Sequence, residues 1–182
     1  MIRMLLCAAM LAGAAAPAAA FKLESPDIKS GGTMDKKFEA NVFGCTGENK
    51  SPALKWSGAP KDTKSFAVTV YDPDAPTASG FWHWAVANIP ASVTELPSGA
   101  GDKDDPQLPD GAVQLRNDGG FAGYVGAAPP SGHGTHRYFV VVHAVDTDTL
   151  DVDADTTPAV LGFNLFFHTL GRATLVATYT EG

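Results

Sequence analysis

The chain has 182 residues, 45% of them hydrophobic, and a formal net charge of −7 at pH 7. Because this charge repels polyanions, neither nucleic acid nor an anionic membrane surface is an expected partner, and a site for an anion has to be built locally. A chain of this length is expected to form one domain with a core that buries most of its apolar side chains.

The first twenty residues read MIRMLLCAAMLAGAAAPAAA, with an early arginine, an apolar middle and three alanines before Phe21. This layout is typical of a secretory signal peptide, so we expect residues 1–20 to be removed and residues 21–182 to form a single exported, periplasmic domain. A membrane anchor is the alternative, but the apolar run is short and proline interrupts it. Removal takes away Arg3, which leaves a net charge of −7 − 1 = −8. No later segment approaches the ~20 apolar residues of a membrane span, so we expect no stable membrane insertion.

Short runs rich in valine and aromatic residues, bounded by proline, glycine and aspartate, predict the strands. They are Leu54–Ser57, Phe66–Tyr71, His83–Ile89, Tyr138–Val145 and Ala173–Tyr179. The loops are rich in turn residues, for example DPDAPTASG and YVGAAPPSGHG, and long helices do not alternate with the strands. This pattern predicts an all-β sandwich with a short C-terminal helix rather than a parallel βαβ sheet.

The helix is predicted between Thr157, which suits the N-cap, and Gly171, which suits the end. Pro158 suits its first turn. We expect the buried face to consist of Ala159, Val160, Phe163, Leu165, Phe166 and Phe167. Only Cys45 follows the predicted signal peptide, so no intramolecular disulfide is expected, and we expect this thiol to be buried and inert.

The period of two in a strand places His136 and Tyr138 on one face of the Tyr138–Val145 strand and its approach, and Arg137 on the other. We expect Arg137 to have a structural role and to pair with Asp72 or Asp74. By the same parity Asp72 continues the core-facing row of the Phe66–Tyr71 strand. The loop before His136 is rich in glycine and alanine, so its backbone N–H groups could form a nest for an anion.

Taken alone, these polar residues also have ordinary structural explanations. Asp72 could accept N–H bonds from its own turn, and His83, between two tryptophans, could be a buried core histidine. We expect His133 to lie at the surface, His143 and His168 to be structural, and Trp82 to line any pocket beside His83.

Two loops with their strands together point to one family. YDPDAP followed by WHWAVANIP, and YVGAAPPSGHGTHRY followed by an apolar strand, resemble the phosphatidylethanolamine-binding proteins, specifically the bacterial Raf-kinase-inhibitor-like branch. CTGENKSPALKWSGAPKDTKSFAVTVYDPDAP and LPDGAVQLRNDGGFAGYVG add to the likeness. The resemblance implies a β-sandwich with a small anion pocket at one end and no established catalysis. Carried over residue by residue, it implies these ligand-binding positions: Asp72, Pro76, His83, Gly126, Ala127, Ala128, Pro129, Pro130, His136 and Tyr138.

The expected function is therefore the non-enzymatic binding of a small anionic ligand, phosphate or a phosphoethanolamine-like head group, without a cofactor or a metal ion in the site. Imidazolium N–H groups would hold the anion, so affinity should rise as the pH falls. One alternative is a protein-binding or inhibitory module with an extracytoplasmic partner, or a homodimer. Another is a phosphoester-directed or metal-assisted enzyme that uses the Asp/His/His cluster.

Overall fold

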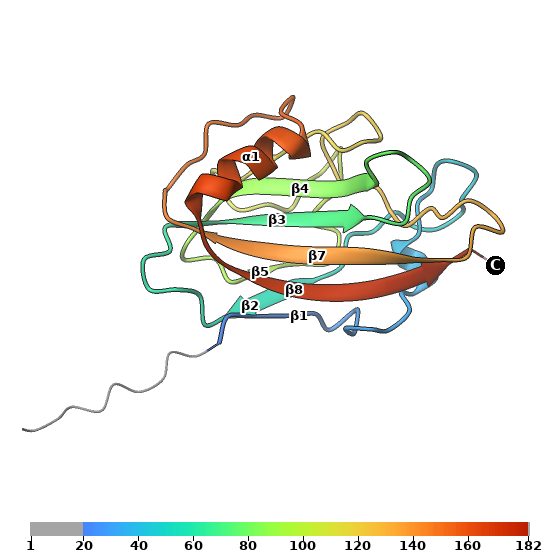
Figure 1. The fold of residues 1–182 in the computed structure, drawn as a ribbon, viewed down its shortest axis with the longest axis horizontal. Coiled ribbons are helices and arrows are strands. Elements are labelled where there is room, and N and C mark those ends of the chain that lie inside the picture. The colour runs from blue at the N-terminus through green and yellow to red at the C-terminus, as the bar shows by residue number, and fades with distance from the viewer. Residues whose placement is uncertain (1–19, 182) are drawn as a thin grey trace, which may run out of the picture.

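The computed structural model describes residues 20–181, which form two antiparallel β-sheets and one α-helix (Figure 1). The predicted signal peptide lies outside the described residues except for Ala20. In chain order the elements are β1 (Lys22–Glu24), the 3₁₀ helix η1 (Lys36–Phe38), β2 (Leu54–Ser57), β3 (Ser65–Asp72), β4 (Phe81–Pro90), β5 (Glu95–Leu96), β6 (Val113–Gln114), β7 (Thr135–Val145), α1 (Pro158–His168) and β8 (Thr169–Thr180).

The predicted all-β sandwich with a short helix is confirmed. The large sheet has the strand order β6-β4-β3-β7-β8, and the small sheet has the order β1-β2-β5. All five predicted strands are present, and four of them extend beyond the predicted ends. The sequence did not reveal β1, β5 and β6, because strands of two or three residues are too short to show an alternating pattern.

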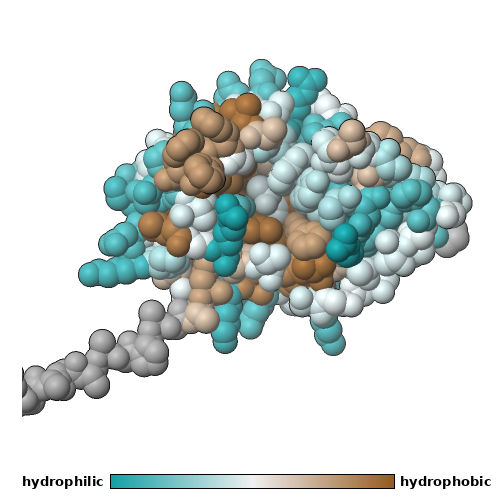
Figure 2. All heavy atoms as spheres, in the orientation of Figure 1, coloured by the Kyte–Doolittle hydropathy of each residue, from teal (hydrophilic) through white to brown (hydrophobic). Residues whose placement is uncertain are grey.

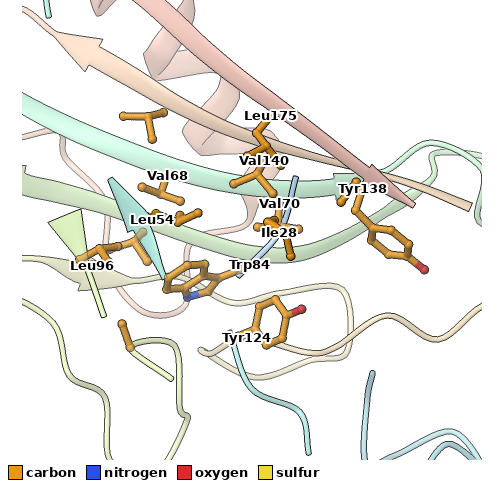
Figure 3. Close-up of a cluster of buried hydrophobic side chains, with 14 of the residues drawn as sticks. Ile28, Leu54, Val68, Val70, Trp84, Leu96, Tyr124, Tyr138, Val140 and Leu175 are labelled. Atoms are coloured by element: carbon orange, nitrogen blue, oxygen red, sulfur yellow. The ribbon is translucent and has the colours of Figure 1, made fainter. Parts of the chain in front are cut away.

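The main core fills the space between the two sheets. Figure 3 shows Val68, Val70, Trp84 and Val140 of the large sheet facing Leu54 of the small sheet. Trp56 and Trp84 are 2% and 0% exposed, as expected for the largest apolar side chains of the core. This packing fixes the large sheet as the rigid platform from which the loops at its ends project.

The helix begins as predicted, but its buried face was predicted wrongly. The Thr157 hydroxyl accepts a hydrogen bond from the Val160 N–H, and Pro158 occupies the first turn. Only Leu161 and Leu165 of the later turns are buried, against the outer face of the large sheet. The other predicted core positions of the helix are exposed, because at 3.6 residues per turn they lie away from the Leu161–Leu165 stripe: Ala159, Val160, Phe163, Phe166 and Phe167.

Three of these exposed side chains form an apolar surface group on α1. Phe163, Phe166 and Phe167 are 67%, 76% and 61% exposed, and their rings pack on one another. The brown group at the upper left of Figure 2 lies over α1. The helix ends at His168, and Gly171 lies within β8, so glycine does not end the helix. Within residues 20–181, no helix is long and apolar enough to cross a membrane.

Candidate functional site

The sandwich brings the ends of three neighbouring strands together at one end of the large sheet. Because β3 runs antiparallel to both β4 and β7, its last residues lie beside the first residues of those strands, with Asp72 opposite Phe81 and Tyr71 opposite Phe139. This end of the sheet is on the right in Figure 1, where the long loops gather. Asp72, His83 and His136 meet there, although 64 residues separate the first from the last.

Asp72 is the centre of the site, where its carboxylate contacts both its own turn and His136. Its side chain is 2% exposed. Oδ1 accepts the N–H groups of Asp74 and Ala75 at 2.8 and 3.1 Å, which is the turn-forming role. Oδ2 lies 2.7 Å from Nδ1 of His136. A carboxylate only accepts, so Nδ1 of His136 carries a proton and donates, and this bond orients the ring so that Nε2 points away from Asp72.

His83 is held in the same Nδ1-protonated tautomer, but by a backbone carbonyl. Its Nδ1 lies 2.9 Å from the carbonyl oxygen of Val125, so Nδ1 donates there. Nε2 lies 4.0 Å from Oδ2 of Asp72 and has no hydrogen-bond partner among residues 20–181. Burial lowers the pKa of His83, opposed by the Val125 hydrogen bond and the Asp72 charge. His83 was expected to be a charged donor. Near pH 7 it is instead a neutral imidazole, and its Nε2 is a hydrogen-bond acceptor.

His133 joins this cluster, which its expected surface position did not suggest. Its Nδ1 lies 2.7 Å from Nε2 of His136, and the two rings meet edge to face. His133 is exposed and sits in the loop before β7. The chain Asp72–His136–His133 thus connects a buried carboxylate with the surface. Its only sequence signal is the three-residue spacing in HGTH, which is too common to identify a site.

A pocket of about 230 Å³ opens over these groups. Its floor is polar, whereas its rim is apolar and includes the exposed ring of Phe43, which packs edge to face on Phe81. Phe43 was not predicted, since an aromatic residue in a glycine-rich loop gives no pattern. The lining consists of Phe43, Asp72, Ala75, Pro76, Thr77, Phe81, His83, Ala128, Pro130 and His136.

The loop carried over from the resemblance enters the site only in part. Ala128 and Pro130 line the pocket, whereas Pro129 is buried. The N–H of Gly126 donates to Oδ1 of Asn49 at 2.8 Å. The N–H of Ala127 donates to a backbone carbonyl of η1 at 3.0 Å. The predicted nest of free N–H groups is therefore wrong at Gly126 and Ala127, because both amides already have protein acceptors.

Tyr138 supports the pocket floor from below. It is 1% exposed, and its ring meets the ring of His83 at a centroid distance of 5.1 Å. In Figure 3 its hydroxyl points away from the apolar cluster. The hydroxyl is buried and makes no hydrogen bond of normal geometry in the described part of the chain, although the backbone of Ala128 lies close to it. Burial, with the nearby Asp72 charge, raises the pKa of Tyr138 well above its usual value, so the phenol is neutral.

Arg137 has the predicted structural role, with Asp74 and not Asp72 as its partner. Nε and Nη2 of Arg137 donate to Oδ2 and Oδ1 of Asp74, both at 2.8 Å, and the backbone N–H of Arg137 donates to Oδ2. These side-chain hydrogen bonds lower the pKa of Asp74 to about 2. The pair ties the DPDAP turn to the start of β7, which holds Asp72 against His136.

Trp82 does not belong to the pocket, contrary to expectation. It lines a second hollow of about 490 Å³ between α1 and the outer face of the large sheet, together with His143 and Arg172. The alternation of side chains along β4 explains this, because Trp82 and His83 point to opposite faces of the sheet. The two hollows therefore lie on opposite sides of the large sheet.

These contacts define what the pocket floor offers a ligand. At neutral pH Nε2 of His83 is an acceptor without a partner among residues 20–181. Nε2 of His136 is hydrogen-bonded to Nδ1 of the exposed His133, which a ligand could replace. The hydroxyl of Thr77, which lines the pocket, already donates to the carbonyl of Gly80. The site thus combines one acceptor with one switchable donor, an arrangement that suits a partly protonated oxyanion.

Comparison with known proteins finds one family over most of the chain. The family model for phosphatidylethanolamine-binding protein matches residues 24–180. The chain is 50% identical to the UPF0098 protein YbcL of Escherichia coli over 164 residues, 90% of each chain. It is 47% identical to the UPF0098 protein YbhB of the same organism, which covers 87% of this chain and 99% of that protein.

Solved structures show the same relationship. The crystal structure of E. coli YbcL, described as a new member of the mammalian PEBP family, has a TM-score of 0.88 and 48% identity over 90% of this chain and all of that one. A putative family homologue from Chlamydia trachomatis has a TM-score of 0.76 and 30% identity, with 90% and 99% of the two chains covered. The chain therefore belongs to the phosphatidylethanolamine-binding protein family, in the bacterial branch of YbcL and YbhB.

Proposed function

We propose that this chain is an exported, non-enzymatic binding protein whose pocket takes a small phosphate-bearing anion, such as the head group of a phospholipid. The observation that carries the proposal is the buried Asp72–His136 pair in the lining of the pocket, with Nε2 of His136 bonded only to the exposed His133. Export rests on the composition of residues 1–20. The mass of the chain secreted into the periplasm tests it, because a processed protein starts near Phe21.

The floor favours a phosphate monoanion. A phosphate oxygen can replace His133 as the partner of His136, and protonation of His136 makes Nε2 a charged donor to that oxygen. On a phosphate monoester, a P–OH group can donate to the neutral Nε2 of His83, whereas a phosphodiester has no such proton and is held by His136 alone. A dianion lacks that proton and would face both the His83 lone pair and the Asp72 carboxylate, so it should bind more weakly.

The rim suits the apolar part of the same ligand. Phe43, Phe81, Pro76 and Pro130 surround the opening and offer hydrocarbon surface next to the polar floor. This combination matches an amphiphile whose phosphate reaches the histidines while its carbon atoms contact the rings. The family's name, which refers to phosphatidylethanolamine, is consistent with such a ligand.

The test is a titration of residues 21–182 with phosphoethanolamine and with glycerophosphoethanolamine, by calorimetry and by histidine NMR signals at pH 5.5 and 8. The second ligand is a phosphodiester and keeps one negative charge throughout, so its pH dependence reports the protein alone. We expect its affinity to rise about 10-fold towards pH 5.5, the effect of one charge-assisted hydrogen bond of about 1.5 kcal/mol.

The variant is His136→Gln, and the matched control is His168→Gln. His168 also pairs through Nδ1 with an aspartate, Asp146 at 2.8 Å, but it lies at the end of α1. We expect His136→Gln to lose at least about 10-fold in affinity and His168→Gln to bind like the unaltered chain. Equal affinity in all three chains would refute the pocket. Turnover of a phosphoester that is lost in His136→Gln would instead favour the enzyme alternative.

A further inference from the structure

A second group of polar side chains lies outside the pocket, where three distant segments meet. Glu39 follows η1, Cys45 lies in the loop after it, and Glu181 follows β8. One ligand atom from each of these side chains lies within 4.8 Å of the other two. In Figure 1 the blue segment around η1 and the red end of β8 meet at the same end of the molecule.

The carboxylate of Glu39 is the unusual member of this group. The residue is 4% exposed, and Oε2 is buried without a hydrogen-bond partner among residues 20–181. Its backbone is fixed, because its carbonyl accepts the N–H of Asn49 at 2.8 Å and its N–H donates to Lys36. A buried carboxylate that lacks a partner is costly. The fold therefore holds in place one acceptor oxygen, Oε2, whose neighbouring donors within residues 20–181 are the Cys45 thiol and the Tyr179 hydroxyl.

The surroundings of the group are negative. Burial raises the pKa of the Cys45 thiol, and the charges of Glu181 and Glu39 raise it further. Burial and the Glu39 carboxylate likewise raise the pKa of the Tyr179 hydroxyl to about 12. Such an environment does not make a reactive nucleophile of Cys45, since the thiolate is disfavoured. The two carboxylates that lie beside the thiol attract a cation instead.

We propose that Glu39, Cys45 and Glu181 bind a borderline-soft divalent metal ion, for which Zn²⁺ is the representative. The mixed sulfur and oxygen donors suit Zn²⁺, whereas Ca²⁺ and Mg²⁺ prefer six or more oxygen ligands. Binding releases the thiol proton of Cys45 to solvent as the sulfur–metal bond forms. Three protein ligands leave the fourth tetrahedral position for water, and bonds of about 2.0–2.3 Å require the side chains to move closer together than they lie now.

The direct experiment is calorimetric titration of EDTA-treated residues 21–182 with ZnCl₂ in a phosphate-free buffer. Alkylation of Cys45 is followed in parallel with and without Zn²⁺. We expect one Zn²⁺ per chain and at least about 10-fold slower alkylation, because the metal occupies the sulfur. Mg²⁺ and Ca²⁺ should give neither effect. Unchanged alkylation at saturating Zn²⁺ would overturn the proposal.

Four variants separate this site from other zinc ligands. We expect Cys45→Ser and Glu39→Gln each to weaken Zn²⁺ binding at least 10-fold, the magnitude known for changes at metal sites. Glu48→Gln, in the same loop but outside the group, and His136→Gln should both bind Zn²⁺ normally. Loss of Zn²⁺ binding in His136→Gln alone would assign the metal to the histidine pocket. If Cys45→Ser does not fold, the alkylation result with the unaltered chain still decides.

Discussion

The buried His143 makes the fold sensitive to acid, and the size of the effect follows from its environment. His143 lies near the end of β7, between β3 and β8, and is 8% exposed. Its Nδ1 has no hydrogen-bond partner within the described chain, and Arg172 stands opposite it on β8. Burial, followed by the charge of Arg172, lowers the pKa of His143 to about 4.

The direction of the effect comes from proton linkage. The unfolded chain takes up a proton at a pKa of about 6.5, whereas the folded chain does so only near pH 4, so stability falls as the pH drops through this window. Between pH 7.5 and pH 5 the loss is about 2 kcal/mol, because 1.5 pH units below the unfolded pKa cost about 1.4 kcal/mol each. For a domain of this size this corresponds to a Tm lower by roughly 4–8 °C.

The assay is urea unfolding followed by tryptophan fluorescence at pH 7.5 and pH 5, at equal ionic strength and without phosphate. His143→Gln removes the titrating group while keeping a polar side chain of similar size. His83, whose pKa is also lowered, adds to the acid sensitivity of both chains and cancels in the difference. We expect the variant to lose about 2 kcal/mol less than the unaltered chain. Equal losses in the two chains would refute the assignment of the effect to His143.

Four further substitutions test the packing and the site. Leu165→Ala should lower the free energy of unfolding by about 2–5 kcal/mol, while Phe166→Ala on the exposed side of the same helix should change it by less than about 0.5 kcal/mol in urea unfolding. Gly126→Ala should lower the Tm or prevent folding, because its Cβ would meet backbone atoms of Ala40 and Glu39 that cannot move aside. Tyr138→Phe should raise stability by about 1 kcal/mol in the same assay, since it removes a buried hydroxyl without a partner in residues 20–181. A decrease in stability would show that the hydroxyl is satisfied.

Much of the fold could be predicted, because the relevant signals lie within a few neighbouring residues. Alternation along one strand placed His136 on the buried side of β7 and Arg137 on the other. The same argument put Asp72 at the end of a core-facing row. The Thr157–Pro158 pair marked the start of α1. Each of these features depends on local geometry that the chain repeats every two or 3.6 residues.

The sequence was less informative wherever the outcome depended on what packs against a residue. The face of α1 that is buried was decided by the outer surface of the large sheet, so the aromatic residues of the helix, Phe163 among them, remain in solvent. The amide of Gly126 looked available for an anion, but Asn49, 77 residues earlier, occupies it. The neutral state of His83 likewise follows from burial, which no single strand specifies.

The sequence by itself thus determined the family motifs, the strands and the residue types of the pocket. Only the tertiary structure decided which of these residues meet. It joined Asp72 to His136, 64 residues away, and placed Glu181 beside Glu39, residues 142 positions apart in the numbering (181 − 39). The physical reason is that donor–acceptor distances, burial and charge depend on segments remote in the chain, whereas periodicity and capping depend only on neighbours.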